Sequence, residues 1–65
     1  MRIILNGEAR DCVAGTVEQV LEEAGYGDAV VATALNGRFV PVAERASTPI
    51  AEGDEVEVLA PMQGG

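Results

Sequence analysis

The stretch "GTVEQVLEEAGYG" (residues 15–27) decides the fold, because it carries the clearest helical period in the chain. Its apolar residues recur at i, i+3, i+4 and i+7 and form one stripe of a helix: Val17, Val20, Leu21 and Ala24. Thr16 and Gln19 match a capping box at the start, and Gly25 suits a left-handed cap at the end. Such a stripe must be buried against another element.

Residues before this helix predict a β-hairpin. Asn6-Gly7 separates an apolar run from an alternating one, and Asn-Gly favours a tight turn because both residues tolerate positive φ. We expect strands at about residues 1–6 and 8–13. Ile3 and Leu5 should then share one face, with Ile4 on the other.

Residues after the helix predict further strands. "AVVATALNGRFVPV" (29–42) contains a second Asn-Gly, and Pro41 should limit the strand that follows it. An irregular crossing segment and a turn at 52–54 then lead to a last strand in "EVEVLA" (55–60), with Val56 and Val58 inward. The order β β α β β β predicts an α+β fold, in which a mixed sheet of four to five strands packs on one helix.

Composition narrows the possible functions. The 65 residues suit one domain, and 48% of them are hydrophobic. A net charge of −7 disfavours nucleic acid and membrane surfaces as partners and favours a basic protein face. The chain has no histidine and no lysine, which removes the commonest general base, the usual zinc ligand and Schiff-base chemistry.

Location and boundaries follow from the same sequence. A single cysteine gives no internal disulfide, and no apolar run approaches the ~18 residues of a membrane span. The first residues lack the features of a signal peptide, so we expect a cytoplasmic protein. We expect a folded domain over residues 1–60 and a flexible tail over residues 61–65, with Pro61 ending the last strand.

Several side chains that resemble reactive groups have a structural interpretation. Cys12 has no histidine to activate it and is expected in the core. Ser47 and Thr48 precede a proline and are expected in a turn. Four clustered acids fit no calcium loop, so we expect no metal site and a solvated face or docking surface instead: Glu52, Asp54, Glu55 and Glu57.

An apolar docking face is a further candidate. Ile4, Phe39 and Leu59 should fall on the sheet face opposite the helix, where an exposed apolar patch marks a docking surface. For Phe39, core and interface are equally consistent with the pattern. Leu59 favours the interface because Val56 and Val58 have the other parity.

The element order, the "LNG" hairpin turns, the closing "GDEVEV" and the terminal "GG" together resemble the β-grasp sulfur carriers, and within them the ThiS family of thiamin biosynthesis. The likeness runs from end to end. It implies a ubiquitin-like β-grasp fold with the first and last strands side by side at the centre of the sheet.

The resemblance also implies the chemistry. An E1-like enzyme would use ATP to adenylate the carboxylate of Gly65, and sulfur from a donor protein would displace AMP to give a thiocarboxylate. Gly64 would give clearance in the enzyme's channel, while Gln63 and Met62 would hold the tail. The acceptor would be a thiazole synthase. The protein is then a monomeric cosubstrate, not an enzyme, and binds no cofactor of its own.

Three alternatives remain open at this point. Sulfur delivery to molybdopterin keeps the mechanism and changes the pathway. A β-grasp interaction module would use the glycines only as a tail. A ubiquitin-like modifier would be joined to lysines of other proteins.

Overall fold

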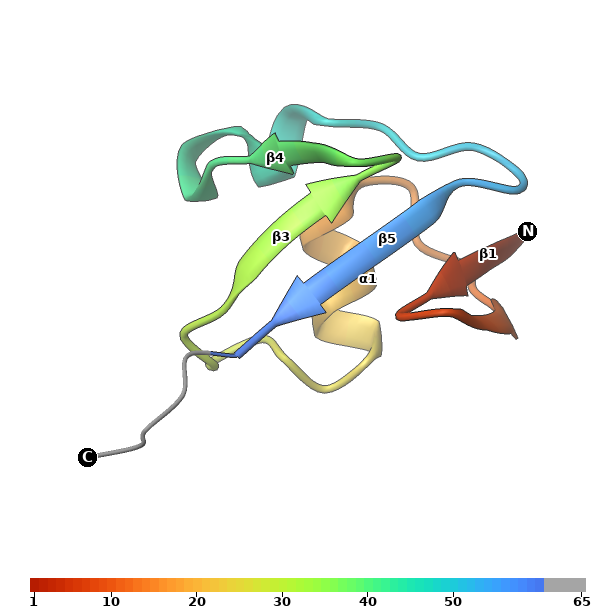
Figure 1. Cartoon of the computed structure of the whole chain (residues 1–65), viewed down its shortest axis with the longest axis horizontal. Coiled ribbons are helices and arrows are strands. Elements are labelled where there is room, and N and C mark those ends of the chain that lie inside the picture. The colour runs from red at the N-terminus through yellow and green to blue at the C-terminus, as the bar shows by residue number, and fades with distance from the viewer. Residues whose placement is uncertain (61–65) are drawn as a thin grey trace.

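The computed structural model describes residues 1–60, which form a mixed five-stranded sheet with one α-helix across one face (Figure 1). The strand order is β2-β1-β5-β3-β4, with β1 and β5 parallel and the other neighbours antiparallel. The elements in chain order are β1 (Arg2–Leu5), β2 (Glu8–Asp11), α1 (Val17–Glu23), β3 (Ala32–Leu35), β4 (Arg38–Val40), the 3-10 helix η1 (Val42–Ser47) and β5 (Glu55–Leu59). The predicted fold class and the central pairing of first and last strands are confirmed.

Both hairpins turn on the Asn-Gly pairs that the sequence indicated. Asn6 and Gly7 have φ of 50° and 84°, and Asn36 and Gly37 have φ of 51° and 82°. Positive φ at both central residues defines the type I′ turn, whose twist matches that of the strands it joins. Strand β2 is shorter than predicted and ends at Asp11. The chain leaves the sheet there to begin the approach to α1.

Helix α1 begins and ends as its sequence predicts. The Thr16 hydroxyl accepts the Gln19 N–H at 3.2 Å, while the Gln19 side-chain oxygen accepts the Gly15 N–H at 2.7 Å. In a standard capping box the Gln19 side chain would accept the N–H of the N-cap residue Thr16; here it accepts that of the preceding residue, Gly15. At the other end, Gly25 has φ of 92°, and the Tyr26 N–H donates to the Leu21 carbonyl at 2.7 Å. This Schellman arrangement stops the helix.

The core lies between α1 and the inner face of the sheet. Its most deeply buried apolar side chains come from β1, α1 and β5: Ile3, Val17, Val20 and Val56. Cys12 is buried among them, which confirms its structural role. None of the helices formed by residues 1–60 is long and apolar enough to cross a membrane.

The crossing segment is more regular than the sequence suggested. Residues 43–47, expected to be irregular, form together with Val42 the 3-10 helix η1 against α1. Arg45 on η1 is buried, and its Nη2 donates to the Val31 carbonyl. Arginine is seldom buried unless it has a partner. The polar residues of this segment therefore did not predict an element that packs against the core.

Candidate functional site

Strand β5 carries the chain toward the predicted reactive tail. It is hydrogen-bonded on both sides, by β1 and by β3, and runs parallel to β1, so its end lies at the opposite end of the sheet from Met1 (Figure 1). Leu59 pairs with Ala32 at the last position of the β3 ladder. The point at which the chain leaves the sheet is therefore fixed. Met62, Gln63, Gly64 and Gly65 lie outside the described residues, and their roles stay predictions.

The turn residue Asn6 extends the support of β5 beyond the end of β1. Its backbone N–H donates to the Val56 carbonyl at 2.9 Å, and its side-chain oxygen accepts the Val58 N–H at 2.8 Å. The side chain thus stands in for a further strand residue. Sequence reasoning assigned Asn6 only to the turn and missed this role.

Two adjoining hollows on the outer face of the sheet lead to the end of β5. One is lined by Phe39, Leu59, Glu57 and β3, and the other by Leu59, Ala60 and residues 30–32. Ala32 and Leu59 belong to both. Apart from the buried Val31, we call their apolar lining the apolar strip; it comprises Val30, Ala32, Ala34, Phe39, Leu59 and Ala60.

The predicted docking residues occupy this face unequally. Phe39 is 70% exposed and Leu59 67% exposed, and both line the strip. Ile4 is on the same face but pairs with Glu55, at the far end of β5 from Leu59, and does not line either hollow. Val30, 81% exposed, adds to the strip and was missed. Val30 lies next to the buried Val31 in an apolar run, so the sequence did not indicate that only one of the two valines is exposed.

The chain as a whole is acidic, with a net charge of −7. The chain carries eleven acids, and within residues 1–60 the only ion pair joins Arg2 and Asp11 at 3.9 Å, both well exposed. Among those residues no group of acids, cysteine and histidine is arranged to hold a metal ion. Such a surface favours a basic partner.

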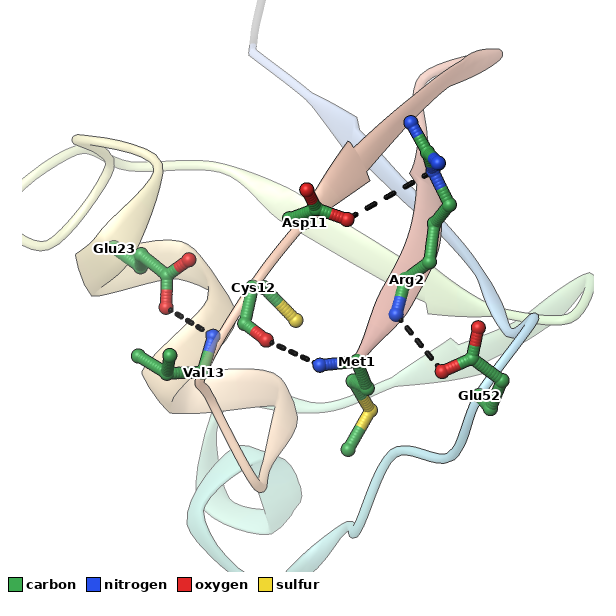
Figure 2. Close-up of a pocket in the computed structure, with 7 residues that line it drawn as sticks. All are labelled: Met1, Arg2, Asp11, Cys12, Val13, Glu23 and Glu52. Atoms are coloured by element: carbon green, nitrogen blue, oxygen red, sulfur yellow. Dashed lines mark hydrogen bonds and ion pairs between the residues drawn. The ribbon is translucent and has the colours of Figure 1, made fainter.

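A larger hollow lies at the opposite end of the sheet, around the N-terminus (Figure 2). Its polar groups are engaged in holding the chain. The Met1 ammonium donates to the Cys12 carbonyl at 2.9 Å, Glu52 accepts the Arg2 N–H at 2.9 Å, and Glu23 accepts the Val13 N–H at 3.1 Å. These bonds give the residues a structural role, remote from the end of β5.

The two hydroxyls near Pro49 are also structural. The side chains of Ser47 and Thr48 both donate to the Glu44 carbonyl, at 3.2 and 2.7 Å. Ser47 is the last residue of η1 and Thr48 is its C-cap, so the predicted turn is replaced by the end of a 3-10 helix. The candidate site therefore consists of the apolar strip and the tail that follows it.

Comparison with known proteins decides the family. The ThiS family matches residues 3–65, which includes the tail. The chain belongs to the ThiS family. It is 44% identical to the sulfur carrier protein ThiS of Thermus thermophilus, over 94% of this chain and 95% of that protein. It is 33% identical to the sulfur carrier protein ThiS of Escherichia coli over the whole of both chains.

Two further matches extend this picture of a ThiS protein. The crystal structure of the thiamine biosynthesis protein ThiS from Geobacter metallireducens superposes with a TM-score of 0.82, at 29% identity and full coverage of both chains. A thiazole synthase of Paramagnetospirillum magneticum is 36% identical over all of this chain, which spans 20% of that protein. The fold is thus the ubiquitin-like β-grasp, and as a ThiS-family member the chain is a sulfur carrier protein.

Proposed function

We propose that this protein carries sulfur for thiamin biosynthesis as a thiocarboxylate on Gly65. The observation that carries the proposal is the ThiS family match, which continues through the terminal glycines. The fixed end of β5 supports it, because a rigid exit from the sheet presents the following residues to a partner in one direction.

Activation is needed because a free α-carboxylate is ionised at neutral pH and is a poor acyl electrophile. The Gly65 carboxylate attacks the α-phosphate of ATP in an E1-like enzyme, which releases pyrophosphate and forms an acyl-adenylate. A sulfur nucleophile supplied by a donor protein then attacks the acyl carbon, and AMP leaves. ATP is the enzyme's substrate and needs no binding site on the carrier.

The tail sequence suits this reaction. Gly64 and Gly65 have no Cβ, so an extended tail ending in them fits a narrow channel and allows close approach to the nucleotide. Met62 and Gln63 supply apolar contact and hydrogen bonds ahead of the glycines. The carrier contributes the reacting carboxylate, and the enzyme contributes the catalytic groups.

A thiazole synthase is the proposed acceptor. Support comes from the P. magneticum thiazole synthase, in which a segment resembling this whole chain is part of the same protein. Two functions that meet in one reaction gain effective concentration when they share a chain. We propose that this protein meets its synthase through the apolar strip, with its net charge of −7 favouring a basic surface on the synthase.

Mass spectrometry of the intact protein tests the proposal. Incubation with ATP, a sulfur donor and the activating enzyme from the same organism should replace one oxygen by sulfur at Gly65. A variant without Gly65 is the matched control and should keep its mass. A mass gain in that variant would move the chemistry to another residue, and adducts on lysines of other proteins would instead indicate a modifier.

A further inference from the structure

Glu57 is the only acidic residue that lines the apolar strip. It pairs with Ala34 on β3, and Ala34 pairs in turn with Phe39 on β4. Glu57 and Phe39 therefore stand on either side of a small residue on the same face. Leu59, two residues along β5 on that face, borders the same hollow.

Within residues 1–60, Glu57 makes no ion pair and its carboxylate accepts no hydrogen bond from the protein. Of the four arginines, Arg2 pairs with Asp11 and Arg45 is buried against Val31, while Arg10 and Arg38 form no ion pair with Glu57 among the described residues. The carboxylate is thus available to a partner. It is also the one carboxyl group in a hollow otherwise lined by apolar side chains and Thr33.

The dimensions of this hollow favour a side chain over a small molecule. Its volume is about 100 Å³, whereas sites for small ligands usually measure ~300–1,000 Å³. It has room for the end of one long side chain. An arginine fits best, because its planar guanidinium pairs with a carboxylate and stacks on an aromatic ring.

We propose that Glu57 and Phe39 together receive an arginine side chain of the enzyme that activates the tail. This inference rests on the proposed function. The second hollow of the strip shares Leu59 with the first and extends to Ala60, the residue before the tail. An enzyme that holds the tail would cover both hollows. Its apolar side chains would contact Val30 and Leu59, and its arginine would lie beside Glu57.

Charge makes this contact selective. Covering the strip removes water from Glu57, and a desolvated carboxylate without a partner is costly. An apolar partner surface without a cation is therefore rejected, while one with a correctly placed arginine is accepted. If the carboxylate of Glu57 stayed in water in the complex, it would not discriminate between these two partner surfaces.

Steady-state kinetics of adenylation with Glu57→Gln test the assignment. We expect KM for the carrier to rise about tenfold or more. The kcat should stay within about twofold, because Glu57 takes no part in the reaction at the Gly65 carboxylate. Glu55→Gln is the matched control. It removes the same charge from the same strand and face, beside Ile4 and outside the strip, and should change KM by less than about threefold.

A second variant isolates the aromatic contact. Phe39→Leu keeps an apolar side chain and removes the ring, and should raise KM in the natural background but add little in Glu57→Gln. Equal KM values for Glu57→Gln and Glu55→Gln would overturn the inference, provided the natural protein is adenylated. If the natural protein is not adenylated at all, the proposed function fails instead.

Discussion

The side-chain oxygen of Asn6 lies 2.8 Å from the backbone nitrogen of Val58, so a residue in the first turn holds the last strand across 52 positions of sequence. This bond continues the β1–β5 pairing after β1 has ended. Its partner N–H is part-buried, so it would be left unsatisfied if the acceptor were removed.

Asn6→Gly should lower the free energy of unfolding by about 1–2 kcal/mol. Glycine accepts the positive φ of this position but offers no side-chain oxygen. Asn6→Asp keeps an acceptor and should stay closer to the natural stability. Urea unfolding of the two variants measures the difference; equal losses would show that the turn, and not the bond to Val58, needs asparagine.

Gly25→Ala should destabilise the protein by about 1–2 kcal/mol through backbone strain. A Cβ at Gly25 would meet no atom within 4 Å, so its φ of 92° is the only obstacle. Gly27→Ala is the control, since its Cβ would make an ordinary 3.7 Å contact with Glu22. Thermal unfolding should show a lower Tm for the first variant and little change or a small gain for the second.

Neighbouring residues of β5 should separate stability from recognition. Val58 is buried and Leu59 is 67% exposed. Val58→Ala should cost about 1–3 kcal/mol of unfolding free energy, with little change in KM for adenylation below the unfolding transition. Leu59→Ala should change stability by less than about 0.5 kcal/mol and raise KM, because it removes apolar contact next to the tail. The reverse pattern would place the docking surface elsewhere.

Arg45 should contribute more through its hydrocarbon stem than through its charge. The guanidinium bonds the Val31 carbonyl, while Nε is buried and has no hydrogen-bond partner within residues 1–60. Arg45→Met keeps the stem and should cost less stability than Arg45→Ala, for which we expect about 2–3 kcal/mol. Chemical denaturation compares the two; equal losses for methionine and alanine would make the guanidinium the dominant contribution.

Salt should act on the free protein and on its encounter with the enzyme in opposite directions. Seven net negative charges repel one another, and screening relieves this repulsion, so Tm should rise slightly with NaCl. The association rate with a basic enzyme surface should fall over the same range. An association rate independent of salt would argue against electrostatic steering.

Local signals made most elements predictable. The helical stripe of residues 17–24, the two Asn-Gly pairs and the alternation of β5 are each contained within one short segment, so sequence alone indicated them. Register is different. The pairing of Ile4 with Glu55 joins distant segments and depends on how the whole core packs.

The candidate site was predictable in part. Parity favoured the outer face for Leu59 and left Phe39 between core and interface. The strip also needs Val30, whose exposure depends on where the loop after α1 meets β5. The burial of Arg45 and the bond of Asn6 to Val58 likewise require the assembled fold. Reactivity at the glycine pair came from family resemblance, because two glycines alone specify no chemistry.

The central place of β5 has a consequence for synthesis on the ribosome. Until residues 55–59 have emerged, β1 and β3 each present an unpaired edge, and the sheet cannot close. The nascent polypeptide therefore completes this fold only after β5 has emerged from the ribosome. A transcript truncated before this strand would yield an aggregation-prone fragment. It would not yield a folded carrier that lacks only residues 61–65.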